Sequence, residues 1–247
     1  MRNVICFILI LFLLVSFSCR KSGKVTSTHV EFIVIDSTLN PIADVSYNRM
    51  LDSLDQILGA GLDSVIGYCK INATVYRPEC ELLNWVSDAL LERGRSAFPG
   101  KVDVAIMNIG GLRCNIPQGD ITIRQIQSLM PFNNELCIIT LKGRYLLELC
   151  QVICMKGGQG ISNMRIVGEN NQLISATVGG APIDNDSDYY IAVSDYLMEG
   201  MDGLTPLANH GDVWNTNVFL RDILLDAVRS QDTIRLIKDN RIVLRTL

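Results

Sequence analysis

Histidine is scarce in this chain, which has 247 residues and only two histidines, His29 and His210. Two-metal hydrolases and many other metalloenzymes hold their ions with several histidine and aspartate side chains. Two isolated histidines do not supply such a set. The sequence therefore argues against a catalytic metal centre of this kind within the chain.

Other familiar sites are missing as well. Neither a G-x-S-x-G nucleophile elbow nor a phosphate-binding P-loop occurs. An excess of basic charge is also lacking, because 22 Lys and Arg residues stand against 26 Asp and Glu residues and leave a net charge of −4. Since nucleic-acid-binding domains usually present a basic face, this balance argues against a nucleic-acid partner. With 48% hydrophobic and 19% charged residues, the composition is typical of a globular protein.

Long apolar runs are absent after the first 18 residues. The run at Val4–Val15 has about a dozen residues, too few to span a bilayer and suited to a signal-peptide core. It ends at residues 16–19 (SFSC), which resemble a bacterial lipoprotein signal. We expect residues 1–18 to be removed and lipid on Cys19 to anchor an exported protein to a membrane, on the periplasmic or cell-surface side. The alternative is an ordinary secretory signal in which Cys19 has no role.

The rest of the chain is expected to be a polar tether (residues 19–29) followed by one domain (residues 30–247). Hydrophobic periodicity predicts helices at residues 45–58, 79–94, 124–129 and 216–229, and one that begins at Gly143. It predicts strands at residues 30–35, 70–75, 102–107, 137–141, 163–178, 189–193 and 241–245. Strands and helices alternate without a Pro- or Ser-rich linker, which favours a single α/β or α+β domain.

Six cysteines remain beyond the signal segment and Cys19. They are Cys69, Cys80, Cys114, Cys137, Cys150 and Cys154. Their spacing matches no disulfide framework, and Cys150 and Cys154 lie on one face of a predicted helix without a histidine partner. An exported protein could pair the six cysteines, so their disulfide state stays open. For Cys150 and Cys154 we expect buried thiols, with a metal pair as the alternative.

One candidate binding loop follows the predicted strand at residues 102–107 and reads NIGGLR (residues 108–113). Gly110 and Gly111 allow a backbone to approach a ligand closely. Arg113 offers a planar fork for phosphate or carboxylate oxygens, and Asn108 offers both a donor and an acceptor. The loop is either part of an anion or nucleotide pocket or a simple turn.

Two later segments combine an aromatic residue with polar groups. Residues 131–134 (PFNN) present Phe132 beside amides, and residues 194–203 (SDYLMEGMDG) contain Tyr196 and Asp202. An exposed aromatic ring can stack on a base, and an aspartate can accept hydrogen bonds from ribose hydroxyls. Taken singly, a core aromatic and a glycine-flanked turn are the alternatives.

In order along the chain, the segments ECELLNWVSDAL, NIGGLR, PFNN, LKGRYLLEL and YYIAVSDYLMEGMDG resemble the C-terminal domain of the bacterial 5′-nucleotidase/UDP-sugar hydrolase family. The resemblance extends from about Val45 to the C-terminus and rests on the ordered set of motifs. It implies a four-layer α/β/β/α domain, of the α/β (α+β) class, that binds nucleotides and related phosphates.

The resemblance also implies substrate-binding residues. Asn108 and Arg113 match a family segment that contacts the substrate, and Gly110 and Gly111 lie between them. Arg77 is the nearest match to a further arginine of the family, which precedes the helix containing Asn84.

Three more binding residues follow from the same comparison. Phe132 and Tyr196 match two aromatics that clamp the base, although the family more often has Phe at the second position. Asp202 matches an aspartate that holds the ribose, with Met201 in place of a family glycine.

The family's catalytic half has no counterpart in these residues. Full-length members hydrolyse phosphate esters with a separate metallophosphatase domain, which holds two metals through Asp-x-His and Gly-Asn-His-Glu segments. Residues 208–212 (ANHGD) are superficially similar to the second segment but lack the first, so His210 is interpreted as a loop histidine. We therefore expect no catalytic residue, metal ligand or cofactor in this chain, and divalent metals only in a partner.

Two functions stay open. In the first, the chain is the nucleotide-binding half of a 5′-nucleotidase-type phosphoester hydrolase, active in nucleotide catabolism with a separately encoded metallophosphatase. In the second, it is a non-catalytic, lipid-anchored protein that binds nucleotides or nucleosides. Both expect a nucleotide ligand, a membrane reached through Cys19, and no nucleic acid.

Overall fold

The structure is a computed structural model that describes residues 27, 29–32, 34 and 44–245. The predicted signal segment, Cys19 and most of the tether lie outside the described residues. The predicted strand at residues 30–35 is wrong for the residues that are described there, because residues 30–32 and 34 have no regular structure. Within the described residues, the first helix is α2 (Val45–Leu62), where a helix is predicted at residues 45–58. The chain divides into two compact units, and the boundary between them lies within α2, after Leu51. The second unit, Asp52–Leu247, contains the sheets described below.

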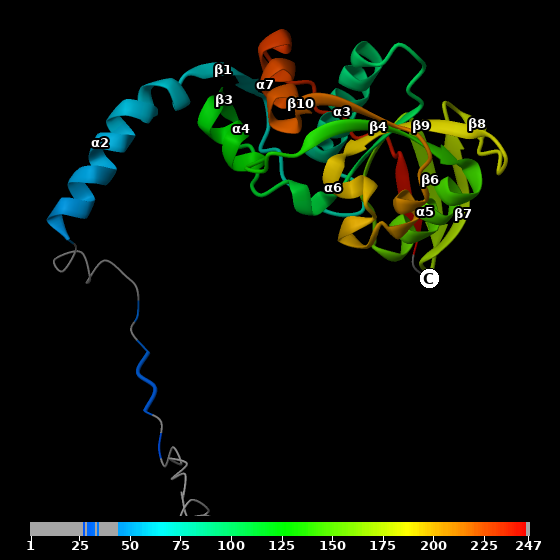
Figure 1. The fold of residues 1–247 in the computed structure, drawn as a ribbon, viewed down its shortest axis with the longest axis horizontal. Coiled ribbons are helices and arrows are strands. Elements are labelled where there is room, and N and C mark those ends of the chain that lie inside the picture. Colours follow the sequence, from blue (N-terminus) through cyan, green and yellow to red (C-terminus); the bar gives the residue numbers. More distant parts are fainter. Residues whose placement is uncertain (1–26, 28, 33, 35–43, 246–247) are drawn as a thin grey trace, which may run out of the picture. The chain divides into compact units, whose positions relative to one another are not determined.

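A five-stranded sheet forms the centre of this unit (Figure 1). Its strand order is β10 (Val213–Phe219), β4 (Glu135–Lys142), β9 (Asp188–Ser194), β2 (Val104–Met107) and β5 (Gly160–Ser162). Strands β2 and β9 pair in parallel, and the other neighbours pair antiparallel. All four residues of β2 are buried, as expected for a strand that is covered on both faces.

One face of this sheet is covered by α3 (Glu81–Ala97) and α7 (Leu220–Gln231), together with the short helix α4 (Ile123–Leu129). Leu82, Val86 and Leu90 recur along α3 at helical spacing and are fully buried in this core. Helix α4 begins at a capping box, in which Thr122 and Gln125 each bond to the other's backbone N–H. The two-stranded sheet of β1 (Val65–Cys69) and β3 (Gly119–Thr122) lies beside these helices.

The opposite face is covered by α5 (Gly143–Met155) and by a second, four-stranded sheet. That sheet has the order β11 (Ile242–Arg245), β6 (Met164–Glu169), β7 (Gln172–Val178) and β8 (Ala181–Pro182). Figure 1 shows α3 and α7 on one side of β4, and α5, β6 and β7 on the other. Helices and sheets are packed together on both faces of the central sheet, so the predicted mixed α/β fold class is confirmed.

Two further predicted elements differ from the structure. The strand predicted at residues 70–75 ends earlier, since β1 covers Val65–Cys69 and only an isolated bridge from Ala73 to Ile116 follows. The helix predicted at residues 216–229 begins at Leu220, because the preceding residues form the edge strand β10. Strand β10 is largely exposed, so its sequence lacks the alternation by which a half-buried strand is recognised.

The six cysteines of the domain are all free thiols, and five of them are buried. The prediction of buried thiols for Cys150 and Cys154 is therefore confirmed. Burial, with a smaller contribution from Asp195 and Glu135, raises the pKa of the Cys137 thiol to about 11. Such a thiol is inert at neutral pH, since the thiolate is the nucleophile. Within the described residues, no helix is both long and apolar enough to cross a membrane.

A candidate nucleotide-binding site

The three candidate segments meet at one edge of the central sheet. Strand β2 ends at Met107, directly before Asn108, and its parallel neighbour β9 ends at Ser194, two residues before Tyr196. Strand β4 runs antiparallel to β9 and begins at Glu135, just after Phe132. The ends of β2 and β9 and the start of β4 therefore lie side by side. Open α/β sheets usually bind ligands beyond the carboxyl ends of parallel strands.

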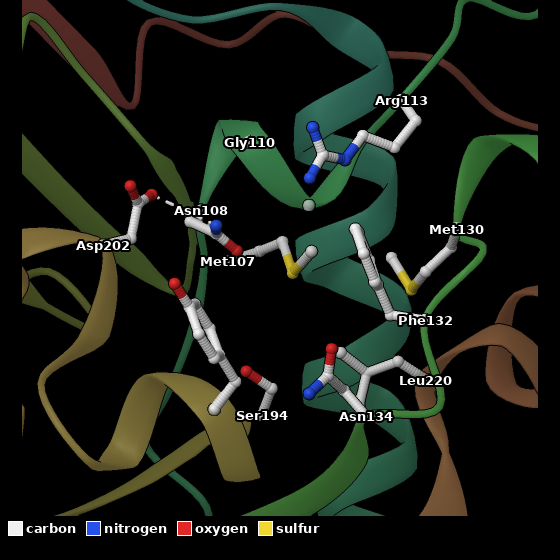
Figure 2. A pocket seen from close by; sticks show the side chains of 12 residues that line it. Met107, Asn108, Gly110, Arg113, Met130, Phe132, Asn134, Ser194, Asp202 and Leu220 are labelled. Atoms are coloured by element: carbon white, nitrogen blue, oxygen red, sulfur yellow. Dashed lines mark hydrogen bonds between the residues drawn. The ribbon is translucent and has the colours of Figure 1, made fainter. Parts of the chain in front are cut away.

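A cavity of about 370 Å³ lies at this edge, within the 300–1,000 Å³ that is usual for small-molecule sites (Figure 2). Seven of the eight residues predicted to bind substrate line it. They are Asn108, Gly110, Gly111, Arg113, Phe132, Tyr196 and Asp202. The structure thus brings together residues that are separated by nearly a hundred positions in the chain.

The loop after β2 forms the back of this cavity. Asn108 is only 8% exposed, and its Nδ2 donates to Asp202 Oδ2 at 3.1 Å. The next residues form a single 3₁₀ turn, Ile109–Gly111. A Cβ on Gly111 would collide with the methyl group of Met107 and would lie 3.0 Å from Asn108 Oδ1. Glycine therefore lets this turn lie close against Asn108.

The backbone of Asp202 has an uncommon conformation. Its φ is 54° and its ψ is 25°, which is the left-handed region that L residues other than Asn and Asp rarely adopt. The flanking Gly200 and Gly203 also have positive φ, at 76° and 67°. This turn brings one carboxylate oxygen of Asp202 to Asn108. The other oxygen has no hydrogen-bond partner among the described residues and can accept from a ligand.

The two aromatic residues expose part of their rings to the cavity. Phe132 is 38% exposed and Tyr196 is 46% exposed, and both line the cavity. The guanidinium carbon of Arg113 lies 4.8 Å from the centre of the Phe132 ring, a cation–π contact. In the described part of the chain, no carboxylate lies within ion-pair distance of Arg113. The cavity therefore presents flat apolar surface and an uncompensated positive charge.

The sequence did not indicate several lining residues. Met107, Met130 and Leu220 add apolar surface, and Asn134 and Ser194 add polar groups. Ser194 caps α6 (Asp195–Met198), since its hydroxyl accepts from the Leu197 N–H. Asn134 is the second asparagine of the PFNN segment, and its position directly before a strand is the only sequence signal that it carries.

Gln159 is a supporting residue that was also missed. It is 1% exposed, and its Oε1 accepts from the backbone N–H of Ile109 at 2.8 Å. This bond fixes the start of the turn behind the cavity. Its Nε2 has no hydrogen-bond partner among the described residues.

Arg77 is not brought into the cavity. Its guanidinium donates instead to the carbonyl of Gly158, in the glycine-rich segment before β5. The predicted grouping of Arg77 with the other seven residues is therefore not seen in this structure.

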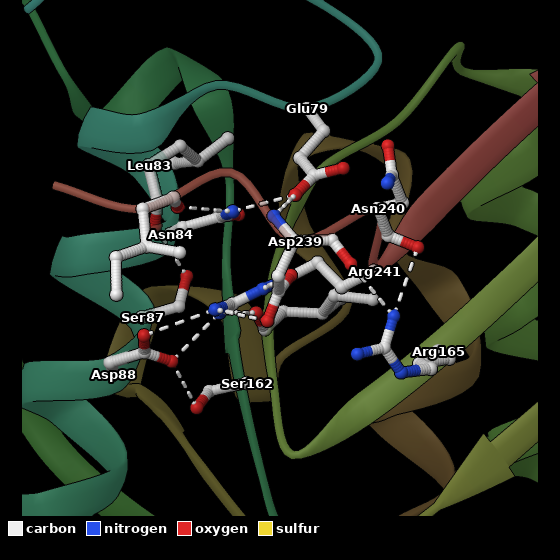
Figure 3. Close-up of polar contacts among 12 residues, drawn as sticks. Glu79, Leu83, Asn84, Ser87, Asp88, Ser162, Arg165, Asp239, Asn240 and Arg241 are labelled. Carbon is white, nitrogen blue, oxygen red and sulfur yellow. Dashed lines mark hydrogen bonds and ion pairs between the residues drawn. The ribbon is translucent and has the colours of Figure 1, made fainter.

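A separate cluster of polar residues, the buried network, links the first turns of α3 to β5 and to the segment before β11 (Figure 3). It is centred on Arg241, which is 7% exposed and bonds to Asp88 Oδ1 at 2.7 Å and to Asp239 Oδ1 at 2.9 Å. Burial alone would lower the pKa of the Arg241 guanidinium, and the bonds to the two carboxylates outweigh burial and raise it. The members of the buried network are Glu79, Asn84, Asp88, Ser162, Asp239 and Arg241.

The structure is an α/β domain with a cavity whose lining combines exposed aromatic rings with an arginine. The described residues contain no cluster of three or more His, Cys, Asp or Glu side chains suited to a metal ion. The family model described as "5′-nucleotidase, C-terminal domain" matches residues 65–209, more than half of the chain. The chain therefore belongs to the 5′-nucleotidase C-terminal domain family.

Similar proteins agree with this assignment. A 5′-nucleotidase from Vibrio parahaemolyticus is 30% identical over 142 residues, which are 54% of this chain and 25% of that protein. The crystal structure of a 5′-nucleotidase precursor from Thermus thermophilus superposes with a TM-score of 0.72 at 23% identity, over 81% of this chain and 43% of that one. The NAD nucleotidase of Haemophilus influenzae gives a TM-score of 0.65 at 14% identity, over 83% and 42%. The two structures show a shared fold, and the chain spans only a quarter to less than half of these proteins.

Proposed function

We propose that this domain binds a nucleotide in the cavity and acts as the substrate-recognition half of a 5′-nucleotidase-type phosphoester hydrolase. The observation that carries the proposal is the grouping of Phe132, Tyr196, Asp202 and Arg113 around one cavity of about 370 Å³. Each supplies a contact that one part of a nucleotide needs.

The base would stack on the exposed aromatic rings of Phe132 and Tyr196. Stacking of a base on an aromatic side chain contributes about 1–3 kcal/mol and tolerates every base. The ribose hydroxyls would donate to the free oxygen of Asp202, and Asn108 holds that carboxylate in place. The phosphate would pair with Arg113, whose charge has no carboxylate partner in the described region.

Hydrolysis requires chemistry that these residues do not offer. We propose that a separately encoded metallophosphatase supplies two divalent metals, which activate water and stabilise the charge that develops on the phosphate. This domain would then contribute by orienting the substrate. We also propose that the protein is exported and that lipid on Cys19 anchors it to a membrane of the bacterial envelope. Its substrates would be the nucleotides present there.

Binding is tested by calorimetric titration of the mature protein with AMP. Removing the phosphate partner or one face of the stack, with Arg113→Ala or Phe132→Ala, is expected to weaken binding about tenfold or more. Arg165→Ala is the matched control, because Arg165 is exposed, lies outside this cavity and donates hydrogen bonds to the backbone carbonyls of Asp239 and Asn240. Equal AMP affinity in all four proteins would contradict the proposed site.

Catalysis is tested by phosphate release from AMP. The mixture of this protein and its cognate metallophosphatase is expected to release phosphate, whereas this protein alone is not. AMP binding without any activity in the mixture would favour a non-catalytic nucleotide-binding protein instead.

A further inference from the structure

The amide of Asn134 is fixed in one orientation. Its Nδ2 donates to Asp195 Oδ1 at 2.8 Å, and the same oxygen accepts from the backbone N–H of Tyr196 at 2.7 Å. An ionised carboxylate accepts hydrogen bonds and donates none. The nitrogen of Asn134 must therefore be the atom that faces Asp195, and its oxygen must face the other way.

That oxygen points into the cavity. Asn134 is one of the lining residues, and Figure 2 shows its amide oxygen directed upward beside Phe132 while its nitrogen points down and away. A ligand that reaches this end of the cavity thus meets a hydrogen-bond acceptor and no donor from Asn134.

The position of Asn134 suits contact with the edge of a stacked ring. In Figure 2, Arg113 lies at the opposite end of the cavity from Asn134, and Phe132 lies between them. If the phosphate is at Arg113 and the base is at Phe132, the edge of the base that is farthest from the sugar is directed toward Asn134.

We propose that Asn134, oriented by Asp195, makes this cavity select nucleotides whose base carries an amino group on the edge farthest from the sugar, as adenine (at C6) and cytosine (at C4) do and guanine does not. This inference rests on the proposed nucleotide-binding function. An amino group donates to the Asn134 oxygen, whereas a carbonyl oxygen at the same place would face a second acceptor. Asp195 does not line the cavity, so it is a positioning residue that acts through Asn134.

The selectivity is tested with a matched pair of ligands, AMP and purine riboside 5′-monophosphate, which lacks only the 6-amino group. Loss of one hydrogen bond that leaves an acceptor unpaired is expected to weaken binding about tenfold in the unaltered protein. In Asn134→Ala the two ligands should bind with nearly equal affinity, because the acceptor is gone. Asn133→Ala is the matched control, since Asn133 is an exposed neighbouring amide that accepts from Arg221 at 3.2 Å and does not line the cavity.

A second variant tests the role of Asp195 without removing the amide that reads the base. In Asp195→Asn the partner can donate as well as accept, so the Asn134 amide is free to turn and offer its N–H₂ to the ligand. The affinity for IMP, which has a carbonyl in place of the amino group, should then rise relative to AMP, about fivefold. A purely structural role for Asp195 would change both affinities together and leave their ratio unaltered.

The outcomes separate this inference from the function on which it rests. If AMP and its deaminated analogue bind the unaltered protein equally well, the selectivity is wrong and the nucleotide site stands. The same holds if Asn134→Ala keeps the tenfold preference. If neither nucleotide binds at all, the proposed function itself fails.

Discussion

Arg113 and Arg241 place the same charged group in two very different surroundings. Arg241 is 7% exposed, and its side-chain nitrogens bond to Asp88, Asp239 and the carbonyl of Ile161. Arg113 is exposed at the cavity, where its guanidinium lies against the Phe132 ring. A guanidinium whose donors are all occupied has nothing left for a ligand, whereas one that faces a cavity with free donors does.

This difference separates residues that hold the fold from residues that recognise a ligand. The buried network joins α3, β5 and the segment before β11 through side chains that are far apart in the sequence. The cavity joins the ends of β2 and β9 and the start of β4, and it leaves polar atoms of Asp202, Asn134 and Arg113 unused. Substitutions in the first region should lower stability, and substitutions in the second should lower affinity.

The largest effect is expected from Arg241→Ala. Removing the buried partner of Asp88 and Asp239 should lower the free energy of unfolding by about 3 kcal/mol, the low end for a buried ion pair because both carboxylates are partly exposed. Urea denaturation measures the loss, and Arg113→Ala should leave the unfolding midpoint nearly unchanged. An unfolding free energy lowered equally by both substitutions would remove the distinction between the two regions.

Gly158 and Gly110 also differ in this way, since one maintains the fold and the other lines the cavity. Gly158 has a φ of 108°, and a Cβ there would collide with the carbonyl of Pro78. A Cβ on Gly110 would have no neighbour nearer than 3.5 Å and would point at Asn108 and Asp202. Gly158→Ala should therefore lower the free energy of unfolding by more than about 1 kcal/mol.

Gly110→Ala should change stability little and weaken AMP binding, because the added methyl group occupies the cavity. Thermal unfolding and calorimetry on the two variants measure both quantities. An unchanged stability in Gly158→Ala, or a lowered stability in Gly110→Ala, would contradict the distinction between residues that hold the fold and residues that bind the ligand.

The smallest effect concerns Asp202, which belongs to the cavity but also has a strained backbone. Asn tolerates the left-handed region almost as well as Asp, whereas Ala does not. Asp202→Asn should keep the stability and weaken AMP binding, since one carboxylate acceptor is lost. Asp202→Ala should weaken binding and also lower the free energy of unfolding by about 1 kcal/mol. Equal stability of the two variants in chemical denaturation would show that the turn is not strained.

Much of this site could be anticipated because its motifs sit at strand ends. The buried runs that end at Met107 and Ser194 predict strands, and the polar residues that follow each run have to lie where the strands stop. The resemblance supplied the order of the segments, and the parallel pairing of β2 and β9 explains why they meet.

Other features depend on contacts that no local pattern records. The hydrogen bond from Asn134 to Asp195 joins residues 61 positions apart. Each lies in a segment that the sequence singles out, but no local pattern pairs the two. The edge strand β10 is exposed on much of its length and is fixed by its register with β4, in which Val213 pairs with Ile139. Arg77 was placed by proximity in the sequence, but its guanidinium reaches Gly158 instead of the cavity.

The most direct test of the central claim is the experimental structure of this protein with AMP bound. The account predicts the adenine ring against Phe132 and Tyr196, the ribose hydroxyls at Asp202 and the phosphate at Arg113. AMP bound instead at the second cavity, which Arg165 and Arg241 line, would contradict the assignment of the site. So would a structure at saturating AMP in which the cavity between Arg113 and Asn134 holds no nucleotide.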